Sequence, residues 1–292
     1  MRFSTRLLAS LILPALIIAL PYGGQDAQNH PWHGSPEGGL IFALYSSPLQ
    51  WLWTELPPTS AQFPADASRS VRLILSDPTA AGPEFHYDDA LPVEKRLSEL
   101  RRITACLEIF PERLRKPLTK ITVKAGTGNP RALSDGRQII IHSVPLSDEE
   151  LCNVVAHEMG HVIDLGFLSG EGFEASAFKD GSVTIPQDDL SVPFYSVSWQ
   201  SEEVAKADAT RLDFATGYSR MNAFEEFGEM TELYVRHGNY LRSLLPTSAA
   251  LRTKYAYLRD IVFEGTEFNT GKPAENTDER KFDSTLVGIK YN

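Results

Sequence analysis

The chain has 292 residues, 42% of them hydrophobic, and a formal net charge of −10. This length is enough to bury a substantial core, in one large domain or in one domain with additions. The negative charge argues against nucleic acid or an anionic membrane surface as a partner. It does not identify a substrate.

Residues 1–27 have the character of a targeting segment. Arg2 and Arg6 precede an apolar run from Leu7 to Leu20. This basic-then-apolar order is typical of a signal peptide, and the run is short for a membrane span. An uncleaved N-terminal membrane anchor is the alternative, and only then would the membrane be a partner. Both interpretations predict an exported protein, either secreted or held in the periplasm or cell envelope.

Composition divides the rest of the chain into three parts. Residues 28–70 predict a leader and an N-terminal packing segment, because a polar stretch rich in Gly and Pro is followed by apolar residues. Residues 71–265 form the expected main domain, with an insertion at about 167–198. Residues 266–292 predict a polar, poorly ordered C-terminal tail.

The first half of the main domain alternates between strand and helix signals. Val71–Leu75 and the β-branched runs at 121–123 and 138–141 predict strands. Apolar residues at helical spacing predict a helix from Pro92 to Phe110. The strand around Gln138–His142 is a candidate edge for pairing with an extended peptide.

The second half predicts mostly helices. Ser147 and Glu150 form a capping box before a helix that we expect to stop at Gly166. Further helices are predicted over Asn222–Leu241 and Ser248–Phe263. The expected fold class is therefore α+β, with a small mixed sheet packed on the helix that carries the site and a largely helical C-terminal half.

Two cysteines, Cys106 and Cys152, would lie in an oxidising compartment after export. A disulfide between them would tie the first helix to the start of the next. Two separate buried thiols are the alternative.

The Ser147 helix contains His157-Glu158-Met159-Gly160-His161, a His-Glu-x-x-His pattern. Side chains four residues apart share one helix face at about 5–6 Å, so the two imidazoles can bind one zinc ion. Glu158 is rotated by about 100° and can take a proton from a zinc-activated water. So short a pattern also arises by chance, so its context decides.

A catalytic zinc needs a third protein ligand. The scattered candidates are His142, Asp164, Glu171, Glu174 and His237. The richest stretch is Asn222–Glu229, where Glu225 and Glu229 share a helix face. Glu225 could then bind zinc while Glu229 holds a ligating histidine. A solvated stripe made by Glu225, Glu229, Glu232 and Arg236 is the alternative.

The motif His157–Asp164, taken with the segment Asp213–Glu229, resembles the anthrax lethal factor-like zinc metallopeptidases, which include Pro-Pro endopeptidases. The resemblance covers roughly residues 90–265. Two departures are Gly228, where alanine is more usual, and a longer gap between His161 and Glu225.

The resemblance implies a zincin-like fold of the gluzincin type and one Zn²⁺ ion held by His157, His161 and Glu225. It makes Glu158 the general base and Tyr218 the donor to the oxyanion. It also makes Glu229 a carboxylate behind the ligands, and Asp164 is expected in the same supporting role.

The predicted function is therefore that of an exported zinc metallopeptidase that acts on a peptide or protein as an endopeptidase. An aminopeptidase is one alternative. A non-catalytic, zinc-stabilised binding or regulatory protein of the cell envelope is another, although such a protein needs neither Glu158 nor Tyr218.

Overall fold

The structure, a computed structural model, describes residues 82–126 and 130–288. The predicted targeting segment, the leader and packing segment, and the strand at Val71–Leu75 lie outside these residues. Within the described residues, no helix is both long and apolar enough to cross a bilayer.

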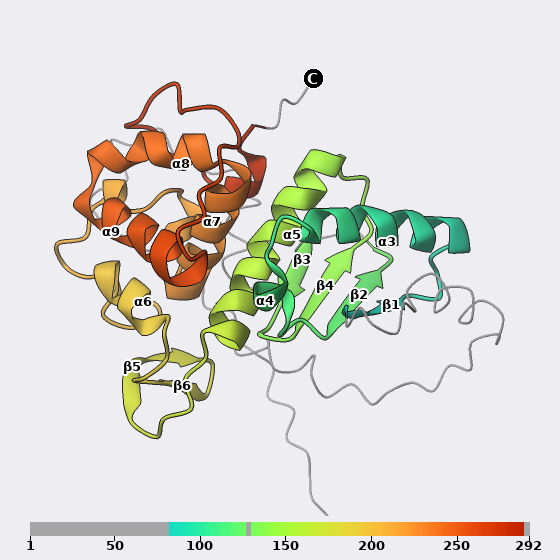
Figure 1. Ribbon diagram of the computed structural model, residues 1–292, viewed down its shortest axis with the longest axis horizontal. Coiled ribbons are helices and arrows are strands. Elements are labelled where there is room, and N and C mark those ends of the chain that lie inside the picture. The colour runs from blue at the N-terminus through green and yellow to red at the C-terminus, as the bar shows by residue number, and fades with distance from the viewer. Residues whose placement is uncertain (1–81, 127–129, 289–292) are drawn as a thin grey trace, which may run out of the picture. The chain divides into compact units, whose positions relative to one another are not determined.

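A four-stranded mixed sheet forms one side of the described region, in the order β1-β2-β4-β3 (Figure 1). Strands β1, β2 and β4 run parallel, and β3 is antiparallel to β4. The alternating residues Ile121, Val123, Ile139 and Ile141 are buried. The strands are β1 (Glu84–Tyr87), β2 (Lys120–Lys124), β3 (Ala132–Ser134) and β4 (Gln138–His142).

The strand signals at 121–123 and 138–141 are confirmed, but the role expected for β4 is wrong. β4 pairs with β2 on one side and with β3 on the other, so it offers no open edge to a peptide. The edges are β1 and β3, which the sequence did not indicate. With only three residues, β3 is too short to show an alternating pattern.

Two helices pack beside the sheet, and α5 lies between it and the helical C-terminal half (Figure 1). They are α3 (Val93–Leu107) and α5 (Asp148–Val162), with a short α4 (Glu112–Arg115) between them in the chain. The disulfide between Cys106 and Cys152 forms and joins α3 to α5. The helix that carries the motif is thus fixed near its start by a covalent link.

The predicted N-terminus of α5 is confirmed. The Ser147 hydroxyl oxygen accepts a hydrogen bond from the Glu150 N–H at 3.1 Å. The reciprocal half of the capping box is absent, because the Glu150 carboxylate accepts from Arg131. The helix also runs past its expected stop, through a π-helical turn at Ile163–Phe167.

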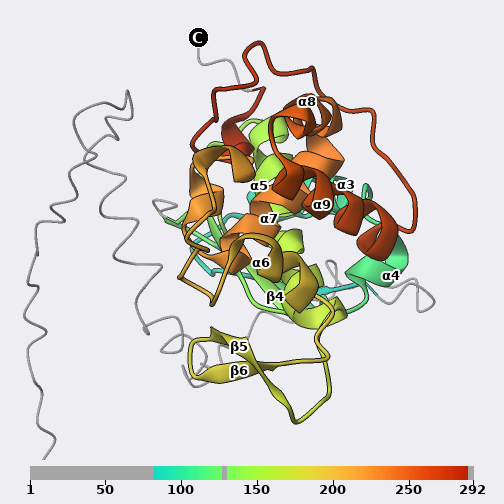
Figure 2. The same ribbon diagram turned by 90° about the vertical axis from the view of Figure 1, so that its left-hand side faces the viewer.

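The C-terminal half is helical, as predicted, and its helices gather on the side of α5 away from the sheet (Figure 2). Its helices are α6 (Val192–Ser198), α7 (Ala223–Arg236), α8 (Gly238–Leu244) and α9 (Ala249–Tyr257). The cap at Asn222 is confirmed, since its side chain accepts from the Glu225 N–H at 2.7 Å.

The single helix predicted over Asn222–Leu241 is instead two helices. The backbone leaves helical geometry at His237, and α8 starts at Gly238. A Cβ atom on Gly238 would lie 2.0 Å from the Phe268 carbonyl oxygen, so the C-terminal segment passes directly against this glycine. The break thus coincides with a tertiary contact, which periodicity cannot reveal.

The insertion at 167–198 is structured rather than a plain loop. It contains a hairpin of β5 (Ala175–Asp180) and β6 (Val183–Pro186), followed by α6. Phe178 in the hairpin is buried against Tyr195 of α6, with ring centroids 5.0 Å apart.

The polar C-terminal tail is also structured as far as residue 288. The Gly217 and Tyr218 N–H groups donate to the carbonyls of Lys281 and Phe282, at 2.8 and 2.6 Å. The Asn153 side chain on α5 donates to the Thr285 carbonyl at 3.0 Å. The expectation of poor order is therefore wrong for residues 266–288, because backbone carbonyls of this segment accept hydrogen bonds from the core. Together the described residues form an α+β fold.

Candidate metal centre

Helices α5 and α7 cross at two glycines. A Cβ atom on Gly160 would lie 2.7 Å from the Gly228 Cα atom. A Cβ atom on Gly228 would lie 3.1 Å from the His157 ring and 3.2 Å from His161 Nε2. Gly228 therefore lets α7 approach both imidazoles closely.

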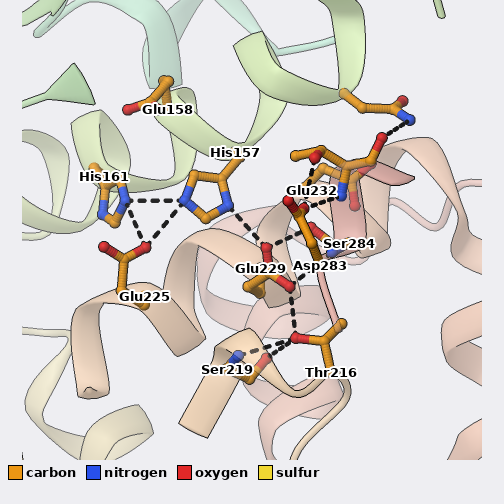
Figure 3. A network of polar contacts seen from close by, with 12 residues as sticks. His157, Glu158, His161, Thr216, Ser219, Glu225, Glu229, Glu232, Asp283 and Ser284 are labelled. Carbon is orange, nitrogen blue, oxygen red and sulfur yellow. Dashed lines mark hydrogen bonds and ion pairs between the residues drawn. The ribbon is translucent and has the colours of Figure 1, made fainter. Parts of the chain in front are cut away.

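Three side chains from the two helices converge at this crossing (Figure 3). The Nε2 atoms of His157 and His161 are 3.2 Å apart. Glu225 Oε2 lies 3.2 Å from His157 Nε2 and 3.5 Å from His161 Nε2. All three residues are buried, and among the described residues they are the one group able to hold a metal ion.

These separations match a tetrahedral zinc site. Zinc–ligand bonds of about 2.0–2.1 Å at tetrahedral angles put ligand atoms about 3.3 Å from one another. The three pairs measured here lie at 3.2, 3.2 and 3.5 Å. The donor set of two imidazoles and one carboxylate also leaves a position for water or substrate. The residues therefore fit the ion that the motif implies.

The electrostatics of the cluster favour a positive charge at its centre. Burial alone lowers the pKa of His157, but the hydrogen bonds and charges of Glu225 and Glu229 outweigh it and raise that pKa well above its usual range. Burial likewise works to raise the pKa of Glu225, and its contacts with His157 and His161 instead hold it well below normal. The carboxylate is ionised and draws a cation.

Glu158 lies beside the cluster and does not join it (Figure 3). Its Oε2 atom accepts a hydrogen bond from the Ser134 hydroxyl at 2.6 Å. Ser134 is the last residue of the edge strand β3, so the sheet holds this carboxylate from the side opposite α7. Glu158 is therefore oriented without occupying a ligand position.

Glu229 lies behind His157, one helical turn after Glu225. Its Oε1 atom is 3.2 Å from His157 Nδ1. This nitrogen has no other hydrogen-bond partner among the described residues. Its Oε2 atom accepts from the Thr216 hydroxyl at 2.5 Å. A carboxylate in this position fixes the tautomer of the imidazole and raises its basicity. The solvated stripe considered as an alternative is absent, because Glu225, Glu229 and Glu232 are buried.

Tyr218 begins a short 3-10 turn just before α7. Its ring centroid is 6.1 Å from that of His157, and the Phe282 ring packs edge-on against it at 6.0 Å. The phenol is therefore in the neighbourhood of the cluster.

Asp164 takes a different place from the supporting carboxylate that was expected. It is fully buried, and its Oδ1 atom accepts from the Tyr195 hydroxyl at 2.5 Å. Burial raises the pKa of Asp164 to about 7, although Tyr195 and the nearby His161 lower it. Its hydrogen bond anchors α6 rather than a histidine of the cluster.

The other ligand candidates lie elsewhere. His142 Nδ1 is 2.6 Å from the Pro130 carbonyl, and His237 Nε2 is 3.4 Å from Glu232. Glu171 and Glu174 are exposed. None of them belongs to the metal-binding group.

Three hydroxyl residues around the centre had no signal in the sequence, namely Ser134, Thr216 and Ser284. Serine and threonine are common, and the pattern of any one segment does not reveal what they touch across the fold. Of the three, Thr216 alone lies within the segment that carries the family resemblance, but that resemblance assigns it no role.

Comparisons with known proteins identify no relative of this chain. No family of known proteins, no curated protein and no solved structure matches this chain.

Proposed function

We propose that this protein is an exported zinc metallopeptidase with a zincin-like fold, related in mechanism to the lethal factor-like peptidases that its motifs resemble. The observation that carries the proposal is the convergence of His157, His161 and Glu225 at the spacing of a tetrahedral zinc site. The expected export is supported by the apolar N-terminal run and by the Cys106–Cys152 disulfide.

His157, His161 and Glu225 would hold the zinc ion. Bound there, zinc would polarise the scissile carbonyl and lower the pKa of water towards about 7. Glu158, held by Ser134, takes a proton from the attacking water and passes it to the leaving amine as the C–N bond breaks. Tyr218 donates a hydrogen bond to the oxyanion of the tetrahedral intermediate. Water is thereby added across one peptide bond.

The non-catalytic zinc protein is the weaker candidate. A structural zinc site closes its fourth position with a protein ligand, whereas the metal-binding group in the described residues has three members. A buried glutamate beside the cluster that is held by a serine also has no part in a structural site.

To test this function, the protein is purified in its exported, naturally processed form and incubated with a peptide library. We expect cleavage with zinc, none with chelator, and restoration when zinc is returned. Glu158→Gln is the matched control, because it keeps the size of the side chain and all three ligands; it should bind zinc and lower hydrolysis about 10²- to 10⁴-fold. A zinc-loaded wild type that leaves every peptide intact would favour the binding protein instead.

A further inference from the structure

The C-terminal segment Lys281–Thr285 reaches the metal centre from behind. Ser284 in this segment is fully buried, and it makes two hydrogen bonds to Glu229 (Figure 3). Its N–H donates to Oε2 and its hydroxyl donates to Oε1, both at 2.8 Å. The segment is about 120 residues away from the His157 motif in the chain, yet only one side chain separates it from that imidazole.

These bonds complete the surroundings of the Glu229 carboxylate. Its two oxygens together contact Ser284, the Thr216 hydroxyl and His157 Nδ1. Three donors other than the imidazole therefore fix both oxygens, so the carboxylate cannot rotate without breaking one of them. Because Glu229 is fully buried, water cannot replace a lost donor without reorganisation.

The segment itself is held on both sides of Ser284. Arg131, at the start of the edge-strand hairpin, donates to Asp283 Oδ2 at 2.7 Å and to the Thr285 hydroxyl at 2.6 Å. The Tyr218 N–H donates to the Phe282 carbonyl at 2.6 Å. The neighbours of Ser284 in the chain are thus held by Arg131, next to β3, and by the turn that carries Tyr218, so contacts other than those with Glu229 also keep this segment in place.

We propose that Ser284 is a positioning residue of the metal centre, which orders Glu229 so that this carboxylate holds His157 ready to bind zinc. The inference rests on the proposed zinc site and extends it to the C-terminal segment. Carboxylates behind metal ligands, when mutated, typically change metal affinity by about 10- to 100-fold. Removing one of the donors that orders such a carboxylate should give an effect near the lower limit.

The experiment measures zinc dissociation constants of the full chain by competition with a chromophoric chelator. Ser284→Ala should weaken zinc binding about tenfold, because Glu229 loses one donor while its backbone donor remains. Thr216→Val removes the other hydroxyl donor without changing side-chain shape, and it should weaken binding by a similar factor. Thr216→Ser keeps the hydroxyl and should bind zinc as the wild type does.

Ser198→Ala is the matched control. Ser198 is also a buried serine, and its hydroxyl has no hydrogen-bond partner among the described residues. It should leave zinc affinity unchanged. The thermal midpoint of each metal-free variant is measured alongside, so that loss of folding is separated from loss of affinity. Thr216→Val decides the matter if Ser284→Ala does not fold.

The outcomes distinguish the two claims. A wild type that binds no zinc overturns both the proposed function and the role of Ser284. A wild type that binds zinc, with folded Ser284→Ala and Thr216→Val variants that bind it equally tightly, overturns the positioning role alone. Weaker binding in both variants and unchanged binding in Ser198→Ala and Thr216→Ser support it.

Discussion

At the scale of single residues, the site separates glutamates that a sequence pattern cannot tell apart. Glu225 faces the two imidazoles, Glu229 lies behind one of them, and Glu226 is turned to Lys254 in a buried ion pair. Three carboxylates within five residues thus have different surroundings, although Glu225 and Glu229 contact opposite nitrogens of the same imidazole, that of His157. The differences arise from the 100° rotation per helical residue and from what packs on each face.

Tyr218 offers a test of chemistry at this scale. Tyr218→Phe should lower kcat about 10²- to 10³-fold and leave KM nearly unchanged, because only the hydrogen bond to the oxyanion is lost. Steady-state kinetics on a peptide from the library digest would measure this. Tyr257→Phe serves as the comparison, since its hydroxyl donates to the Leu190 carbonyl and should leave kcat as it is. If Tyr218→Phe kept full turnover, Tyr218 would be a packing residue.

The residues of the motif could be predicted because their geometry is local. The spacing of His157 and His161 on one helix already places both imidazoles on one face. Helix spacing made Glu225 a candidate and the family resemblance selected it, since no local rule brings α7 onto α5. Ser134 and Ser284 could not be predicted, because their contacts with Glu158 and Glu229 depend on segments 24 and 55 residues away in the chain.

At the scale of elements, the centre depends on how closely α5 and α7 approach. The Cβ atom added by Gly160→Ala would lie 2.7 Å from the Gly228 Cα atom, so the helices must separate. Alanine favours a helix by about 1 kcal/mol over glycine, but overpacking typically costs about 1–3 kcal/mol. We expect net destabilisation and weaker zinc binding, because Glu225 moves away from the imidazoles.

Urea unfolding of the metal-free protein and zinc titration would measure both effects. Gly82→Ala is the control, since a Cβ atom there meets nothing within 4 Å, and it should change neither quantity. A Gly160→Ala protein that is as stable as the wild type and binds zinc as tightly would show that the close crossing is not needed.

Long, periodic helices were predictable and short or irregular elements were not. The caps at Ser147 and Asn222 mark real helix starts, and the buried isoleucines of β4 mark a real strand. The hairpin within residues 167–198 and the ordered tail escaped prediction. Their polar composition is typical of loops. Tertiary contacts stabilise them, such as the ring contact between Phe178 and Tyr195 and the hydrogen bond from Ser284 to Glu229.

At the scale of the whole molecule, the buried pair His237 and Glu232, outside the metal-binding cluster, links stability to pH. His237 Nε2 lies 3.4 Å from Glu232 Oε1, and the pKa of each group is shifted in the direction that favours its uncharged form. Burial and Arg236 lower the pKa of His237 to about 4, and burial raises the pKa of Glu232 well above its usual range. We therefore regard this as a contact between uncharged groups rather than an ion pair.

The sign of the pH effect follows from His237. Between its unfolded pKa of about 6.5 and its folded pKa of about 4, the unfolded chain binds the proton more readily. The stability contributed by neutral His237 is complete above about pH 6.5 and is lost as the pH falls towards 4, by about 2–3 kcal/mol. His237→Gln should remove this dependence.

Urea unfolding of the metal-free wild type and of His237→Gln at several pH values would measure how the free energy of unfolding depends on pH. The effect of Glu232 has the opposite sign, so the difference between the two proteins is the relevant quantity. A difference that stays constant from pH 7 to pH 4 would contradict the assignment.

If His157, His161 and Glu225 bind one zinc ion, the zinc content of the purified full chain must depend on these three residues. After loading with zinc and removal of excess, atomic absorption should find about one zinc per wild-type chain and per Glu158→Gln chain. Glu225→Gln is an equally small change, made on α7 instead of α5. This variant should lose most of the metal. A Glu225→Gln protein that keeps one zinc per chain, or a wild type that binds none, would show that these three residues do not form a zinc site.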